Sequence, residues 1–206
     1  MASSPSVRIV SSRRRTPVET SIRRLLLGLT GSSALLSVLP EFVQMRGALV
    51  QEYVVIMTPA AVRMIAPTLV SSALASDVYI DSMAIENTLP VHRAIPAACD
   101  AALVAPATLN TLSGLAVGAT GNLLTLAIAN FSGPVGVVPT LNREMAAKPA
   151  AKRVLDQLHA DGYLIAEEHH GAATDLSGSA QRGVSKHAIR KLVVQLAQQR
   201  ESGEGA

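Results

Sequence analysis

The chain has 206 residues, of which 49% are hydrophobic, a formal net charge of +3 and one cysteine. This length suits one medium-sized domain built on a central sheet, and a lone cysteine excludes an intrachain disulfide framework. Two Phe, three Tyr and no Trp leave little aromatic surface for stacking bases, so we expect no nucleic-acid partner.

The basic character of the chain is confined to its N-terminus. Residues 1–24 contain six arginines and one glutamate, so their net positive charge exceeds that of the whole chain. The remainder of the chain is therefore net negative. This composition predicts a disordered basic tail over residues 1–22. Arg23-Arg24 followed by the apolar run 25–39 resembles an export signal peptide, but Gly, Ser and Thr interrupt the run. We therefore expect a cytoplasmic protein without a membrane-spanning helix.

The first half of the chain after this tail alternates short apolar strands with helices. Apolar runs predict strands at 25–29, 53–57 and 78–80, with helices over 34–43 and from Ala60 to about Ala75. Small or hydroxylated residues follow the first two strands directly, at residues 30–33 and Thr58. Such a turn between a strand and a helix presents backbone N–H groups to an anion.

The second half continues the same alternation. We expect strands at 101–105, 135–138 and 163–165, and helices at 92–98, 109–117, 123–129, 143–160 and 185–199. Residues 169–183, which are rich in Gly, Ser, Ala and Thr, are predicted to form a flexible loop, and residues 201–206 a disordered tail. Strands that alternate with helices predict an α/β fold with a doubly wound parallel sheet.

Four segments that follow predicted strands carry the candidate chemistry. Ligands of such sheets bind beyond the carboxyl ends of the strands. Here those ends supply hydroxyls, amides and small residues, at residues 30–33, Thr58, 106–111 and 139–142. These groups suit a phosphate held by N–H groups and hydroxyls, beside a flat ring that the backbone approaches closely.

Taken in order, the later segments resemble the homo-oligomeric flavin-containing cysteine decarboxylases. Residues 105–111 (APATLNT) look like the P-A-S-A-N-T motif of that family, residues 118–125 (GATGNLLT) look like G-x-x-D-N-L-L-T, and residues 139–145 (PTLNREM) look like P-x-M-N-x-x-M. His92 stands where the family carries its essential histidine. The resemblance covers roughly residues 23–165, and the chain departs from it at Gly121, Leu141 and Ala146.

The resemblance implies a flavodoxin-like (Rossmann-like) fold and assembly into trimers that often form dodecamers, with flavin bound between subunits. The cofactor would be FMN, or FAD as in some members. Residues 23–200 would form a single flavoprotein domain, with 169–183 as its flexible substrate loop. Catalysis would fall to His92 and Asn142, and substrate binding to Asn142, Met145 and Asn122. The residues around flavin and phosphate would be Gly31, Ser32, Ser33, Thr58, Pro106, Ala107, Thr108, Asn110, Thr111 and Asn122.

The implied reaction explains why such residues are needed. Oxidation of the cysteine side chain to a thioaldehyde provides an electron sink for the loss of carbon dioxide, and the flavin accepts the hydride. His92 would act as acid/base, and Asn142 would hold the carboxylate through its amide N–H₂ group without adding charge.

The cysteine content separates two members of the family. Phosphopantothenoylcysteine decarboxylases use a late cysteine to reduce the enethiolate, whereas residues 167–183 contain none, and we expect Cys99 to pack in the core. This favours oxidative decarboxylation of the C-terminal cysteine of a precursor peptide, in the biosynthesis of a modified-peptide natural product.

Three other functions remain open from the sequence. They are a phosphopantothenoylcysteine decarboxylase of coenzyme A synthesis, a non-catalytic regulatory flavoprotein, and a flavin prenyltransferase, against which Asn142 argues. His169-His170 with Glu167, Glu168 and Asp175 has no tetrahedral ligand spacing, so we expect no metal.

Overall fold

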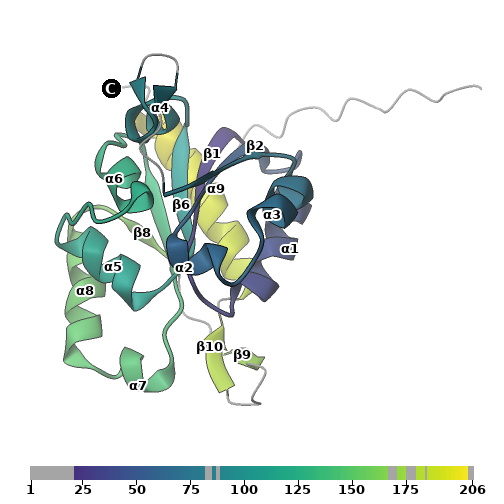
Figure 1. The fold of residues 1–206 in the computed structure, drawn as a ribbon. Helices are drawn as coiled ribbons and strands as arrows, with labels where there is room; N and C mark the ends of the chain where they lie inside the picture. Colours follow the sequence, from purple (N-terminus) through teal and green to yellow (C-terminus); the bar gives the residue numbers. More distant parts are fainter. Residues whose placement is uncertain are drawn as a thin grey trace, which may run out of the picture.

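A six-stranded sheet forms the centre of the protein, and helices cover both of its faces (Figure 1). The computed structural model describes residues 21–81, 85–86, 89–166, 171–174, 180–183 and 185–203. The strand order is β3-β2-β1-β6-β7-β8, and every pairing in this sheet is parallel. The predicted α/β class with a doubly wound parallel sheet is therefore confirmed.

The sheet strands are β1 (Ile22–Leu29), β2 (Val50–Met57), β3 (Asp77–Ile80), β6 (Ala101–Ala107), β7 (Val135–Pro139) and β8 (Leu164–Ile165). Two antiparallel hairpins stand apart from it, formed by β4 (Ile85–Glu86) with β5 (Leu89–Pro90), and by β9 (Gly171–Thr174) with β10 (Ala180–Gly183). The helices are α1 (Leu35–Met45), α2 (Pro59–Val62), α3 (Pro67–Leu74), α4 (Val91–Ala97), α5 (Leu109–Ala116), α6 (Leu123–Ala129), α7 (Arg143–Ala146), α8 (Pro149–Ala160) and α9 (Lys186–Gly203).

Alternate residues of the central strand enter two separate cores. Leu25, Leu27 and Leu29 pack with α1, α3 and α9 on one face, whereas Leu26 packs with α4, α5, α6 and α8 on the other. Successive side chains of a strand point to opposite faces, and helices that cover both faces make the strand apolar throughout. This is why residues 25–29 read as one continuous hydrophobic run.

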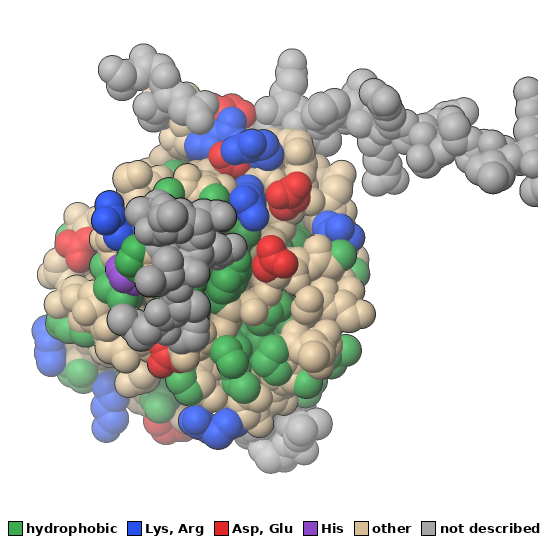
Figure 2. Space-filling model, turned by 45° about the horizontal axis from the view of Figure 1, so that its top comes forward, with side chains coloured by type: hydrophobic (Ala, Val, Ile, Leu, Met, Phe, Trp, Pro, Cys, Tyr) green, Lys and Arg blue, Asp and Glu red, His purple; other side chains and the backbone are tan. Residues whose placement is uncertain are grey.

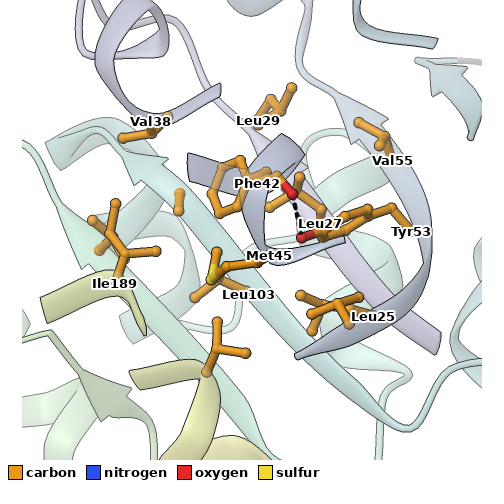
Figure 3. Close-up of a cluster of buried hydrophobic side chains, with 14 of the residues drawn as sticks. Leu25, Leu27, Leu29, Val38, Phe42, Met45, Tyr53, Val55, Leu103 and Ile189 are labelled. Atoms are coloured by element: carbon orange, nitrogen blue, oxygen red, sulfur yellow. Dashed lines mark hydrogen bonds between the residues drawn. The ribbon is translucent and has the colours of Figure 1, made fainter. Parts of the chain in front are cut away.

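The first core is closed by an aromatic pair (Figure 3). The rings of Phe42 and Tyr53 meet edge to face with centroids 6.2 Å apart, and the Tyr53 hydroxyl donates a 2.9 Å hydrogen bond to the Phe42 carbonyl. Burial raises the pKa of Tyr53, so this hydroxyl keeps its proton. The bond fixes α1 on β2 in a core that is otherwise aliphatic.

Two predicted helices are each divided in the structure. The expected helix from Ala60 to Ala75 is split into α2 and α3, and the expected helix 143–160 into α7 and α8. Pro67 and Pro149 occupy the first position of the second helix in each case. Proline lacks the N–H that would bond to the preceding turn, but suits a helix start, so each breaks one helix and begins another.

The predicted ends of the chain also shift. Ile22, placed in the expected tail, is buried and begins β1, and α9 continues to Gly203 through part of the expected C-terminal tail. Residues 1–20 and 204–206 lie outside the described residues. Within 169–183, where the composition predicts a loop, β9 and β10 pair in register from Gly171 opposite Gly183. No helix in the described ranges is long and apolar enough to cross a membrane.

Gly28 should be required for the packing of α6 on β1. A Cβ built there would lie 2.5 Å from Leu124 Cδ1, whereas a Cβ at Gly114 would meet nothing nearer than 3.8 Å. We expect Gly28→Val to lower the free energy of unfolding by about 1–3 kcal/mol through overpacking. In urea titrations the Gly114→Ala control should be neutral or stabilising. Equal stability of Gly28→Val and wild type would contradict the close packing.

Candidate active site

The parallel sheet gathers the predicted segments at one edge. Residues 30–33 follow β1, Thr58 follows β2, Thr108 follows β6 and residues 140–142 follow β7, and each segment leads into a helix. Because parallel strands end on the same side, these segments meet at the carboxyl edge. Figure 1 shows α7 at this end of the molecule and α4 at the opposite end.

Thr30 joins two of these strand ends through one buried hydroxyl. Its Oγ1 donates to the Pro106 carbonyl at 2.7 Å and accepts from the Thr108 backbone N–H at 3.1 Å, and the residue is 1% exposed. The sequence places Thr30 at the end of the strand but gives no sign of this cross-strand role. The hydroxyl fixes the segment after β6 relative to the segment after β1.

The segments after β1 and β2 are in close van der Waals contact. Thr58 caps α2 by accepting from the Ala61 N–H, and its hydroxyl and backbone N–H both reach the Leu29 carbonyl. A Cβ on Gly31 would lie 2.5 Å from the Ala60 Cβ and 3.0 Å from the Ala60 carbonyl carbon. Glycine is therefore required at residue 31 for steric reasons.

The turn after Gly31 retains hydroxyl and backbone donors. The Ser32 backbone N–H donates to the Thr30 carbonyl, and the Ser32 hydroxyl accepts from the Ala34 N–H at 3.3 Å. Ser33 is exposed. These residues lead into α1, as the sequence predicts.

The start of α5 lacks a side-chain cap. Thr108 is the N-cap residue, but its hydroxyl pairs with that of Thr111 at 3.3 Å and accepts no bond from the first-turn amides. Pro106 and Ala107 are in β6, and Asn110 is exposed in the first turn of the helix. First-turn N–H groups need acceptors from a cap, water or ligand, so this end of α5 suits an anion.

Asn142 caps α7 in a way that fixes the orientation of its amide. Thr140 first ties the segment to β6, since its hydroxyl and its backbone N–H donate to the Ala107 carbonyl. Asn142 Oδ1 then accepts the Met145 N–H at 2.8 Å. Only the amide oxygen can accept, so the Nδ2 group remains as the donor on an exposed residue. Met145 is itself 44% exposed.

Asn122 is held at a different place. It caps α6 in a capping box with Thr125, and the next N–H, of Leu123, donates to Asp81 Oδ1 at 2.8 Å. Asp81 directly follows β3, so the expectation that site residues follow the carboxyl ends of strands applies to it as well. Asn122 therefore lies beside the end of the edge strand β3.

His92 is not brought to the same group within one chain. It lies half-buried in the first turn of α4, which packs against α6 and the β4–β5 hairpin and leads into the beginning of β6. Asn142 caps α7, which packs against α8. Since α4 and α7 occupy opposite ends of the molecule in Figure 1, the two expected catalytic side chains lie on separate parts of the chain.

Cys99, which the sequence places in the core, is partly buried at its edge. It contacts the second apolar cluster, and burial raises its pKa to about 12. It also lines a cavity of about 760 Å³ with Asp100, Tyr163 and Arg200. This cavity lies at the amino edge, where Asp100 accepts the Arg24 N–H before β6, so it is remote from the chemistry at the other edge.

The described residues contain no cluster of three or more metal-ligating side chains. The residues for which the sequence predicts no metal site, His169-His170, Glu167, Glu168 and Asp175, lie outside the described residues.

Fold and site together define a class of protein: a parallel α/β protein with an uncharged, donor-rich ligand site at the carboxyl edge of its sheet. A protein-family model described as Flavoprotein matches residues 13–197. This match spans most of the sequence, and the chain belongs to the flavoprotein family. The resemblance seen in the sequence is confirmed at the level of family and fold.

Individual relatives agree with this assignment. The chain is 34% identical over 119 residues to the coenzyme A biosynthesis bifunctional protein CoaBC of Bacillus subtilis, covering 57% of this chain and 29% of that protein. It spans about a third of the length of the curated relatives it matches.

Two solved structures are similar along almost their whole length. The first is the FMN-dependent cysteine decarboxylase SpaF, with a TM-score of 0.73 and 28% sequence identity, covering 87% of this chain and 99% of that one. The second is the FMN-dependent cysteine decarboxylase TvaF from thioviridamide biosynthesis, with a TM-score of 0.66 and 26% identity, covering 85% of this chain and 98% of that one.

The residues present fit a flavin. Segments 30–34, 58–61 and 106–112 contain no charged side chain, but supply hydroxyls and the uncapped amides of α5. N–H groups and hydroxyls bind a phosphate without cationic residues. Gly31, Ser32, Ser33, Thr58, Thr108, Asn110 and Thr111 would hold the flavin and its phosphate.

Thr30→Val should disturb this edge, because it keeps the shape of the side chain but removes both hydrogen bonds of a buried hydroxyl. We expect the free energy of unfolding to fall by about 1–3 kcal/mol. The affinity for FMN, read from the quenching of flavin fluorescence, should fall with it. Thr30→Ser keeps the hydroxyl and is the matched control. Unchanged flavin affinity in Thr30→Val would show that the hydroxyl does not position the site.

Proposed function

We propose that this protein is a flavin-dependent decarboxylase that oxidises and decarboxylates the C-terminal cysteine of a peptide, releasing an enethiol. The observation that carries the proposal is Asn142, an exposed amide whose oxygen is committed to Met145 and whose N–H₂ group is left to donate. The similarity to SpaF and TvaF supports the reaction class. FMN is proposed as the flavin, and a precursor peptide ending in cysteine as the substrate.

Asn142 would bind the substrate carboxylate through these N–H groups. Its neutral donors hold the carboxylate without the strong stabilisation that a cation would give to the group being lost. His92 would take and return the proton of the thiol, because an imidazole ring can both accept and donate a proton. Bound FMN would supply the two-electron oxidation of the cysteine side chain.

The separation of His92 and Asn142 supports a site shared between subunits. α4 lies at one end of the chain and α7 at the other, so a second copy is needed to bring both side chains to one substrate. The surface also offers apolar contacts for such copies, since Leu36 in α1 is 68% exposed and Leu69 in α3 is 56% exposed. Figure 2 shows hydrophobic side chains gathered on one part of the surface among scattered charges. We propose a trimer, with a dodecamer as its further assembly, acting in the cytoplasm.

The second candidate is the phosphopantothenoylcysteine decarboxylase step, which the identity to CoaBC favours. The position of Cys99 argues against it. This is the only cysteine of the chain, it lies before β6 at the amino edge, and its raised pKa disfavours the thiolate. A reducing thiol at the carboxyl edge is therefore lacking, which supports release of the enethiol.

The proposal is tested by aerobic incubation of the flavin-loaded protein with short peptides ending in cysteine. We expect mass spectrometry to show loss of carbon dioxide plus two hydrogens, and no change in a peptide that ends in serine. Loss of carbon dioxide alone from phosphopantothenoylcysteine would establish the second candidate. A flavin-loaded protein that turns over neither substrate would favour a regulatory flavoprotein.

Asn142→Asp should abolish turnover while preserving the fold. Asp is as good an N-cap as Asn, so α7 remains capped, but its carboxylate repels the carboxylate of the substrate. We expect kcat/KM to fall by at least about a hundredfold, with unchanged thermal stability and flavin spectrum. Activity close to wild type would remove Asn142 from the proposed mechanism.

Mixed oligomers test the shared site. His92→Asn and Asn142→Asp should each be inactive alone, since each lacks one of the two groups. If a substrate meets His92 of one subunit and Asn142 of another, co-expression of differently tagged copies should restore about a quarter of wild-type activity in the unfractionated mixture and about a third in mixed trimers. Two-tag purification isolates the mixed species. Absence of recovery would place both residues in one chain.

A further inference from the structure

Among the described residues, one acidic side chain is buried against the first core. Glu41 lies on the buried face of α1 with Val38, Phe42 and Met45, at the spacing of successive helical turns, and its side chain is 2% exposed. A buried carboxylate is costly unless cations and hydrogen bonds compensate it. Glu41 belongs to none of the sequence motifs, although its position in an apolar helical stripe is visible in the sequence.

Both cations that compensate Glu41 come from the start of α9. Lys186 Nζ lies 3.0 Å from one carboxylate oxygen, and Arg190 Nε donates to the other at 3.2 Å. Arg190 also donates from Nη2 to Gln44 Oε1 at 2.9 Å. Burial raises the pKa of Glu41, but the hydrogen bonds and charges of Lys186 and Arg190 lower it further than burial raises it, so the group is ionised at neutral pH.

This contact differs from the rest of the α9 interface. Ile189, Leu192, Val193 and Leu196 hold the helix on the sheet by apolar burial, which has no preferred direction. The far end of α9 lies at the amino edge, where Arg200 approaches Asp100. The Glu41 contact is directional and acts on the first two turns alone.

Those first turns follow the β9–β10 hairpin directly. Lys186 is the third residue after Gly183, which ends β10, and the Ser185 hydroxyl caps α9 by accepting the Ala188 N–H. Figure 1 shows the hairpin at the same end of the molecule as α7, whose cap is Asn142. α1, which carries Glu41, begins just after residues 30–33 of the candidate flavin site.

We infer that Glu41 is a positioning residue that sets where the β9–β10 hairpin stands at the carboxyl edge, and so governs the binding of the peptide substrate. The inference rests on the proposed function, because the peptide is the ligand that the hairpin would meet. Through one carboxylate, the helix that starts at the flavin segment is tied to the helix that starts at the hairpin.

Glu41→Gln removes the charge and keeps the shape. Lys186 and Arg190 are 68% and 42% exposed, so both can turn to water without leaving a buried cation. We therefore expect a folded protein whose apolar core and flavin spectrum are retained. Asp156→Asn, which breaks the exposed Lys152–Asp156 pair of 2.9 Å on α8, is the matched control.

The first readout needs no substrate. Trypsin cleaves after Arg182 in β10, and the products are located by mass spectrometry. We expect initial cleavage at this bond to be about three- to tenfold faster in Glu41→Gln than in wild type, with no change in Asp156→Asn. An unchanged rate would overturn the inference, whatever the activity of the protein.

The second readout separates positioning from general destabilisation. KM for a peptide ending in cysteine should rise about three- to tenfold in Glu41→Gln, with kcat within twofold of wild type, as expected when substrate binding alone is weakened. A fall in kcat at unchanged KM would overturn the inference. If wild type turns over no cysteine peptide, the proposed function fails, and the trypsin experiment still decides the role of Glu41.

Lys186→Gln and Arg190→Gln provide a second route, because each single variant leaves one cation to compensate the buried carboxylate of Glu41. Each should reproduce part of the faster cleavage, and neither should add to Glu41→Gln when combined with it, since the three side chains act as one unit. If Glu41→Gln fails to fold, the two single variants replace it. Wild-type cleavage and KM in both single variants would overturn the inference.

Discussion

The parallel pairing of all six sheet strands is the constraint on which the rest of the protein depends. Parallel strands end at one edge, so the turns after β1, β2, β6 and β7 meet there, although more than a hundred residues separate the first from the last. The Thr30 hydroxyl then fixes two of these turns relative to each other by bonding across the strand ends. The segments after β1, β2 and β6 thereby bring together N–H and hydroxyl donors without a charged side chain.

The distribution of charge follows from this arrangement. The candidate flavin segments hold no charged side chain, whereas the buried carboxylate of Glu41 lies away from them, on the inner face of α1, where two cations compensate it. Neutral donors suit a site that must bind a phosphate and also release carbon dioxide from a carboxylate. A directional ion pair suits the fixing of one helix end, because apolar burial alone does not select a single placement.

Much of the fold was predictable because its signals are local. The continuous apolar run at 25–29 indicated a strand buried on both faces, and α6 begins and ends where its periodicity predicts, at Leu123 and Ala129. The predicted extent of two helices was wrong because a proline, Pro67 or Pro149, divides a sequence pattern that stays amphipathic on both sides. The pairing of β9 with β10 was missed because small polar residues carry no strand period.

The family and the parallel α/β class were readable from the sequence, because strand ends, turns and helix caps are defined by neighbouring residues. Only the tertiary structure decided which groups meet. It joined Thr30 to Thr108, placed Asp81 against the start of α6, paired Glu41 with α9, and left His92 on a different end of the molecule from Asn142. These contacts connect residues from about 40 to 150 positions apart, and at such separations packing of the whole chain, rather than any local pattern, sets the neighbours.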